Sequence, residues 1–142
     1  MGLKSIPKDN EYFKYFNNNP KGLHQSDCIV RAVANVLDRE YVSICMELAE
    51  LQCDTGLADI ALVDKYMSMN GFVKMKRPNH SDGRQYRGYE FVKSPIASCR
   101  RRILANIGVG HITSIIDGKI NDIWDCSGKC IGNYWIKIDS PK

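Results

Sequence analysis

No hydrophobic run in this 142-residue sequence approaches the roughly 20 apolar residues that are needed to cross a bilayer. The first ten residues are polar and lack the apolar stretch of a secretory signal, and neither end carries a myristoylation or prenylation motif. The sequence also has no internal repeat of the period found in solenoids or propellers. We therefore expect a cytoplasmic protein without a membrane partner.

A strong excess of charge is lacking as well. The chain has 20 Lys and Arg against 16 Asp and Glu, a net charge of +4, which is far below that of a dedicated nucleic-acid-binding protein. The densest basic run, Arg100-Arg101-Arg102, would spread around an expected helix, since each residue advances the helix by about 100°. This favours a solvated face over a nucleic-acid patch. The apolar fraction of 44% is typical of one globular domain and argues against disorder.

Disulfide bonds are not expected in a reducing compartment, so the six cysteines need another explanation. They predict buried thiols, a nucleophile or a metal site. Cys126 and Cys130 have the spacing of half a zinc site, but a structural zinc site needs four ligands and the sequence offers no second Cys/His pair. We expect neither a metal nor a cofactor. Cys45, Cys53 and Cys99 lie on expected helices, where packing is their expected role.

Hydrophobic periodicity predicts helices in the first part of the chain and strands in the last part. The expected helices cover residues 28–37, 41–52, 54–69 and 95–106. The expected strands cover residues 72–76, 110–116, 119–126 and 131–138, with an irregular segment at 1–25 and a surface loop at 78–88. This order predicts one α+β domain over residues 1–142, in which N-terminal helices pack on a C-terminal antiparallel sheet.

Three residues combine the chemistry of a thiol nucleophile. Cys28 stands at the start of an expected helix, His111 follows a Gly-rich turn into a strand, and Asp125 lies near the end of the next strand. A helix N-terminus and a nearby imidazole both stabilise a thiolate, and a third polar group orients the imidazole. The pattern predicts Cys28 as nucleophile, His111 as base and Asp125 as the orienting residue.

The register of the hairpin at Asp117-Gly118 decides whether His111 and Asp125 can meet. A two-residue loop places His111 opposite Trp124 and turns Asp125 to the other face. A three-residue loop with Gly118 in the left-handed conformation places His111 and Asp125 diagonally on one face. Neither face is cleanly apolar, so the sequence leaves both registers open.

Three segments give the chain a family resemblance. Ser26-Asp27-Cys28-Ile29-Val30-Arg31-Ala32 resembles the nucleophile helix of small papain-like cysteine peptidases from phage and bacterial genomes. Gly110-His111-Ile112-Thr113 resembles the histidine strand of that family, and Trp124-Asp125-Cys126-Ser127 resembles a part of its C-terminal region. The resemblance, over residues 20–138, implies a papain-like fold, a peptide or protein substrate, and a Cys28, His111 and Asp125 triad. It also implies a phage or mobile-element origin, and hence the host cytoplasm.

One position departs from the family pattern. Papain-like enzymes usually carry a glutamine several residues before the nucleophile, where it completes the oxyanion hole. Here Gly22 stands six residues before Cys28, and Gln25 stands three before it. Gln25 reaches the hole along another path, another group donates, or the hole is incomplete. We therefore expect a thiol-dependent hydrolase, a cysteine peptidase or isopeptidase, and keep as the alternative a non-catalytic phage-type protein-binding or inhibitor module on the same fold.

Overall fold

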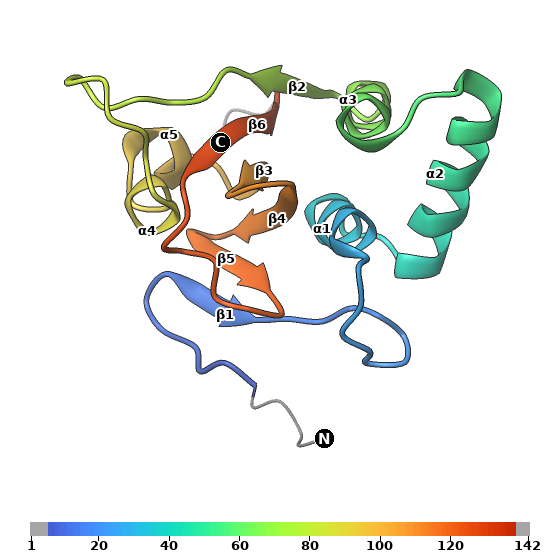
Figure 1. Ribbon diagram of the computed structural model, residues 1–142, viewed down its shortest axis with the longest axis horizontal. Coiled ribbons are helices and arrows are strands. Elements are labelled where there is room, and N and C mark those ends of the chain that lie inside the picture. Colours follow the sequence, from blue (N-terminus) through green and yellow to red (C-terminus); the bar gives the residue numbers. More distant parts are fainter. Residues whose placement is uncertain (1–5, 139–142) are drawn as a thin grey trace.

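The computed structural model describes residues 6–138 and is built around a six-stranded sheet with the order β1-β5-β4-β3-β6-β2 (Figure 1). The strands are β1 (Phe13–Tyr15), β2 (Phe72–Met75), β3 (Arg102–Ile107), β4 (His111–Ile116), β5 (Lys119–Asp122) and β6 (Ile131–Lys137). The helices are α1 (Cys28–Leu37), α2 (Tyr41–Thr55), α3 (Asp59–Met69), α4 (Gly88–Phe91) and α5 (Pro95–Ser98). The predicted α+β class is confirmed. The sheet is mixed, however, because β1 pairs with β5 in parallel while the other neighbours are antiparallel.

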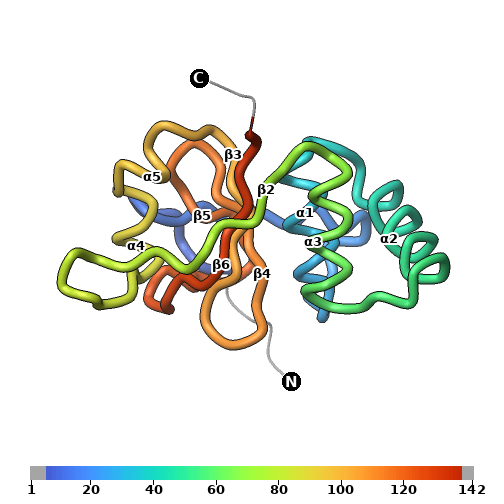
Figure 2. The backbone as a smooth tube through the Cα atoms, turned by 90° about the horizontal axis from the view of Figure 1, so that it is seen from above, coloured from blue at the N-terminus to red at the C-terminus, as the bar shows by residue number. Residues whose placement is uncertain are grey.

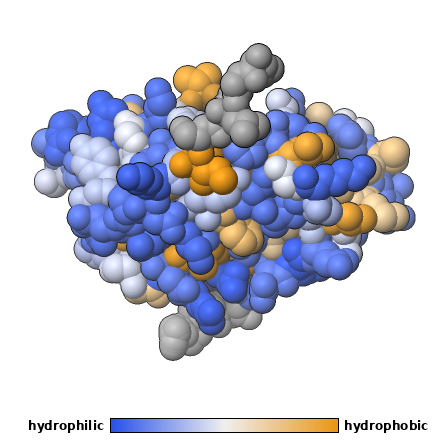
Figure 3. Space-filling view, turned by 90° about the horizontal axis from the view of Figure 1, so that it is seen from below, coloured by the Kyte–Doolittle hydropathy of each residue, from blue (hydrophilic) through white to orange (hydrophobic). Residues whose placement is uncertain are grey.

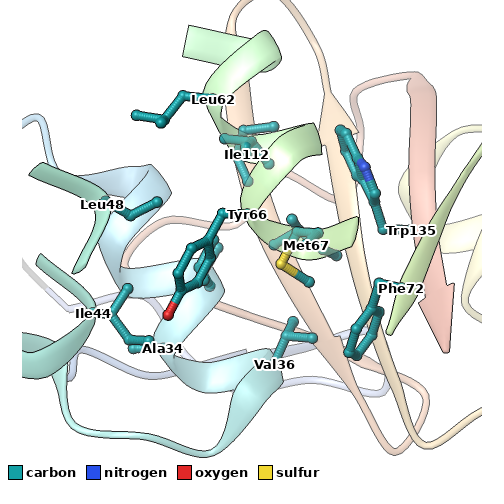
Figure 4. Close-up of a cluster of buried hydrophobic side chains, with 14 residues drawn as sticks. Ala34, Val36, Ile44, Leu48, Leu62, Tyr66, Met67, Phe72, Ile112 and Trp135 are labelled. Carbon is teal, nitrogen blue, oxygen red and sulfur yellow. The ribbon is translucent and has the colours of Figure 1, made fainter. Parts of the chain in front are cut away.

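The sheet is covered on both faces. Helices α1, α2 and α3 lie on one side of it, and the short helices α4 and α5 lie on the other (Figures 1 and 2). The core on the first side gathers around Tyr66, Met67 and Trp135 (Figure 4). The Trp135 indole donates a 3.0 Å hydrogen bond to Asp64. The second core includes Phe91 and many of the sheet isoleucines. Burial on both faces explains why the central strands are apolar along most of their length.

Helix α1 has the bounds that its hydrophobic spacing predicts, and it buries Val33 and Val36 against the sheet. Helix α2 continues beyond the expected end, to Thr55, where Gly56 adopts a left-handed conformation with φ of 75°. The Gly56 N–H bonds to the Gln52 carbonyl at 2.8 Å, which closes the helix. The third helix therefore begins at Asp59, and its expected start at residues 54–55 was wrong.

The expected helix over residues 95–106 is the largest error of the sequence analysis. Ser94 does cap a helix, since its hydroxyl accepts a hydrogen bond from the Ala97 N–H, but that helix, α5, ends at Ser98. The chain then enters β3, a central strand between β4 and β6. A short apolar run that is buried on both faces lacks the alternation of a surface strand, so periodicity does not separate it from a helix. Strand β1 and helix α4 were not predicted either.

Gly88, the first residue of α4, is packed too closely for any side chain. A Cβ there would lie 2.9 Å from the Ile120 Cδ1 and 3.0 Å from the Ser127 Cα, which is backbone. We expect Gly88→Ala to lower the free energy of unfolding by about 1–3 kcal/mol, the usual range for overpacking. Urea denaturation measures this change. Gly128→Ala is the matched control, because a Cβ at Gly128 meets nothing within 4 Å; equal losses in the two variants would contradict the packing argument.

Within residues 6–138, no helix is both long enough and apolar enough to cross a membrane. Seen from the side on which β1 lies, the hydrophobic residues form small separate patches on a largely hydrophilic surface (Figure 3).

Candidate active site

Cys28 is the first residue of α1, and it is partly buried where the helix meets the sheet. The backbone N–H groups in the first turn of a helix have no partner within the helix, and the helix dipole places positive charge there. Because the apolar face of α1 is anchored in the core, the thiol of Cys28 is held at this end in a fixed position. The local sequence thus provides both the nucleophile and an environment that favours its anion.

The hairpin of β4 and β5 positions the other members of the site. Ile116 pairs with Lys119, so the turn has two residues, Asp117 and Gly118, with φ values of 51° and 80°. Continuing this register along the hairpin places His111 opposite Trp124, the first of the two arrangements that the sequence left open. Residues alternate between faces along a strand, so Asp122 lies on the same face as His111.

Asp122, and not Asp125, orients the imidazole. The His111 Nε2 lies 2.7 Å from the Asp122 Oδ2, and the Thr113 hydroxyl donates a 2.5 Å hydrogen bond to the same oxygen. Asp125 is exposed and instead accepts hydrogen bonds from the Ser127 N–H at 3.0 Å and from the Asn10 amide at 3.1 Å. The expected role of Asp125 is therefore corrected, because its carboxylate bonds to Ser127 and Asn10 while the carboxylate of Asp122 bonds to His111.

A buried ion network fastens α1 to the end of β5. The Arg31 guanidinium donates to the Asp27 Oδ1 from Nε at 2.7 Å and to the Asp122 Oδ1 from Nη1 at 3.0 Å. Arg31 is only 6% exposed and Asp122 is 1% exposed. The Asp27 Oδ2 also accepts hydrogen bonds from the Tyr41 hydroxyl at 2.7 Å and from the Asn19 amide at 3.0 Å. The network fixes the helix that carries Cys28 relative to the strand that carries Asp122.

The surroundings of Cys28 favour its thiolate. Burial raises the pKa of the thiol, but a hydrogen bond with the His111 ring, a hydrogen bond with the Ile112 backbone and the nearby Arg31 charge together outweigh burial. The pKa of Cys28 therefore lies below its ordinary value. A lowered pKa increases the fraction of thiolate, which is the nucleophilic form, at any given pH.

The pKa of the His111 imidazole is shifted in the opposite direction to that of Cys28, upwards. Burial lowers the pKa of the imidazole, but hydrogen bonds to Asp122, Cys126 and Cys28 outweigh burial and raise that pKa to about 11. Burial also raises the pKa of Asp122, yet the hydrogen bond and charge of His111 keep it below the ordinary value. The directions of the three shifts favour a thiolate, an imidazolium and a carboxylate as neighbours.

Two further residues enclose the imidazole. The Trp124 ring is 39% exposed and lies 5.1 Å from the His111 ring, measured between ring centres. The Cys126 thiol is buried, and its sulfur lies 3.8 Å from the Asp122 Oδ2. Burial raises the pKa of Cys126, which keeps it a neutral thiol. Of the two cysteines at His111, only Cys28 is therefore suited to attack a substrate.

The same cluster can be weighed as a metal site. The ligand atoms of His111, Asp122 and Cys126 all lie within 4.8 Å of one another, while Cys130, the other half of the expected zinc pair, is not among them. The Nε2 of His111 is already bonded to Asp122, and the Arg31 guanidinium lies 3.0 Å from that carboxylate. A metal also needs a neutral imidazole and a thiolate. Because Asp122 is already bonded to both His111 and Arg31, these residues fit an ion pair better than a metal.

Gln25 lies on the exposed segment before α1. Its backbone carbonyl accepts a 2.8 Å hydrogen bond from the Asp27 N–H. This contact does not link Gln25 to Cys28. The oxyanion donor that the fold supplies most directly is the backbone N–H of Cys28, at the open end of α1.

The pKa of the His111 ring shows whether Asp122 or Asp125 orients the imidazole. We expect Asp122→Asn to lower the pKa of the His111 ring, because a neutral amide no longer favours the imidazolium. Asp125→Asn, the matched control, should leave the titration of that ring unchanged. NMR titration of the imidazole resonances reports both. A shift in the Asp125 variant without one in the Asp122 variant would reverse the assignment.

Sequence reasoning missed Arg31 and Asp122. Sequence features could have identified both residues. Arg31 is a charged residue on the apolar side of α1, four residues after Asp27. Asp122 lies on the same face as His111 if the hairpin turn has two residues. Comparisons of the chain with protein-family models, with curated proteins and with solved structures found no match. The function is therefore inferred from the residues of the site.

Proposed function

We propose that the protein is a thiol-dependent hydrolase, a cysteine peptidase or isopeptidase, in which Cys28, His111 and Asp122 form the catalytic triad. The observation that carries this proposal is the 2.7 Å hydrogen bond between the His111 imidazole and the buried Asp122 carboxylate, in a site where the same imidazole lowers the pKa of the Cys28 thiol. A nucleophile, a base and an orienting group in this order are what acyl transfer requires. The sequence resemblance supports a papain-like fold, as does a nucleophile helix packed on the strand that carries the histidine.

The reaction follows from these roles. The Cys28 thiolate attacks the carbonyl carbon of a peptide or isopeptide bond, and the Cys28 backbone N–H stabilises the oxyanion. The His111 imidazolium gives its proton to the amine nitrogen, the C–N bond breaks, and a thioester to Cys28 remains. Water then attacks the thioester while His111 accepts the proton of that water. The C–S bond breaks, the acid leaves, and Asp122 holds the ring through both steps.

A broad peptide mixture tests the activity, because it offers many candidate substrates at once. Proteome-derived peptides are incubated with the protein, and new termini are identified by mass spectrometry. We expect new termini with the wild type and with Cys45→Ala, a control at an exposed cysteine of α2, and none with Cys28→Ala. Cleavage that survives Cys28→Ala would overturn the proposal.

The position of Gln25 favours a second candidate, the non-catalytic protein-binding module. Gln25 is exposed and its backbone carbonyl bonds to the Asp27 N–H, so the contacts of Gln25 supply no second donor for an oxyanion at Cys28. Loss of one such donor lowers the rate of acyl transfer by about 10²–10³. Peptides that bind equally to the wild type and to Cys28→Ala, without any new termini, would favour the binding module over the hydrolase.

A further inference from the structure

We infer that a hollow at the opposite end of the sheet from His111 binds a small organic phosphate. This cavity of about 360 Å³ lies between the end of α1 and the adjoining ends of β2, β3 and β6. Its volume falls within the roughly 300–1,000 Å³ that is usual for small-molecule sites. We call it the basic hollow, after the four cationic side chains that line it: Arg100, Arg101, Arg102 and Lys137.

Among residues 6–138, no acidic side chain lines the basic hollow. Two of its four cations have a carboxylate partner, since Asp117 lies 3.5 Å from the Arg101 Nε and Asp38 lies 3.9 Å from an Arg102 nitrogen. Within residues 6–138, the ion pairs involve neither Arg100 nor Lys137. An anion can therefore neutralise these charges.

Several of these cations are held in place. The Arg100 Nη1 donates to the Lys137 carbonyl at 2.7 Å, and the Arg102 Nη1 donates to the Asn35 carbonyl at 2.7 Å. The Lys137 ammonium lies 5.8 Å from the centre of the Phe72 ring. Each guanidinium has further N–H groups beyond those bonds, and its planar fork matches the oxygens of a phosphate. Cations that are fixed in advance lose little freedom when they bind an anion.

The basic hollow is more favourable for an anion than the hollow beside it. The neighbouring hollow, of about 670 Å³, shares Arg100 and Arg101 and adds Lys93 and Lys119, but Glu11 and Asp117 also line it. Its net positive charge is therefore lower than that of the basic hollow.

The rest of the basic hollow is apolar. Val36 and Leu37, at the end of α1, and Phe72, at the start of β2, contribute to its wall. This combination favours a phosphate ester whose organic part is compact and apolar. Cys28 stands at the other end of α1, about 14 Å away at 1.5 Å per residue. The basic hollow is thus separate from the thiol site, and neither proposal depends on the other.

Cys99 provides a reporter, because it is exposed and lines both hollows. The probe is phenyl phosphate, and the measurement is the rate at which iodoacetamide alkylates each cysteine, resolved by peptide mass spectrometry. We expect phenyl phosphate to slow alkylation of Cys99 by about fivefold at four times its Kd. Inorganic phosphate, which lacks the apolar part, should need a higher concentration. Cys45 and Cys53, both exposed on α2, serve as internal references and should not change.

The charge is tested by Lys137→Gln, which removes a cation but keeps the carbonyl that Arg100 bonds. This variant should need several-fold more phenyl phosphate for the same protection of Cys99. Lys129→Gln removes the same charge at the other end of the sheet, beside Gly108, and should behave as the wild type. The proposal is overturned by unprotected Cys99 or by equal effects of the two variants. It is also overturned if a single-stranded oligonucleotide protects Cys99 at much lower concentration than phenyl phosphate does, with a steep dependence on salt.

Discussion

Replacing Arg31 with methionine is expected to lower the free energy of unfolding by about 3–5 kcal/mol, the usual result of breaking a buried ion pair from one side. Methionine fills much of the same space but leaves the Asp27 carboxylate without its cation, and among the described residues it leaves Asp122 paired with His111 alone. Asp122 is 1% exposed, so water cannot replace the lost partner without rearrangement of the site. Urea denaturation of the wild type and of Arg31→Met measures the difference.

Arg39→Met is the matched control, because Arg39 pairs with Glu47 in an ion pair that is more than a third exposed. Arg39→Met should lower the free energy of unfolding much less than Arg31→Met does, since solvent screens exposed ion pairs. The pH dependence gives a second check. Asp27 and Asp122 have pKa values below 3.8, so the stability they contribute is present above that value and is lost as the pH falls. The difference in the free energy of unfolding between the wild type and Arg31→Met should therefore become smaller as the pH falls. At neutral pH, a loss of less than about 1 kcal/mol in Arg31→Met would contradict a stabilising role of the Arg31 ion pairs.

Replacing His111 with alanine is expected to slow alkylation of Cys28 by iodoacetamide at pH 7 by about tenfold or more. The imidazole is the first of the groups that lower the pKa of Cys28, and burial alone would raise it. Each unit by which that pKa rises above the working pH reduces the thiolate fraction about tenfold, and the thiolate is the reactive form. The measurement is the rate of Cys28 modification by peptide mass spectrometry.

His80→Ala provides the control for this substitution. His80 stacks on Tyr86 with ring centres 3.9 Å apart, away from the Cys28 site, so its loss should leave Cys28 alkylation unchanged. A Cys28 rate that is equally fast in His111→Ala and the wild type would show that the imidazole does not hold the thiolate.

Much of the fold could be predicted because local patterns and burial agree. The apolar face of α1 has helical spacing and packs on the sheet, so its expected bounds are those observed. The Asp117-Gly118 turn is equally local, and its left-handed backbone makes the hairpin of β4 and β5. Strand β3 could not be recognised, because its hydrogen-bonding neighbours in the sheet, β4 and β6, come later in the chain, and because the cores on the two sides of the sheet bury both of its faces. Its identity depends on pairing that no local window contains.

The residues of the candidate site also fall into two groups, those that the local sequence predicts and those that depend on contacts between distant segments. Cys28 and His111 could be proposed from their immediate contexts, a helix start and a Gly-rich turn. Asp122 depends on the register of a hairpin, where a shift of one residue moves a side chain to the opposite face. Arg31 depends on a contact between α1 and β5, which the order of the elements does not reveal. Two buried charges therefore stayed hidden in segments whose secondary structure was largely predictable.

The pH profile of Cys28 alkylation in the wild type tests the central claim most directly. The lowered pKa of Cys28 means that the thiolate persists to lower pH than in a free thiol, and the His111 pKa of about 11 keeps the imidazolium through the neutral range. We predict a rate that reaches its plateau at lower pH than that of N-acetylcysteine, measured with the same reagent. A midpoint at or above that of N-acetylcysteine would contradict the thiolate–imidazolium pair, and with it the proposed hydrolase.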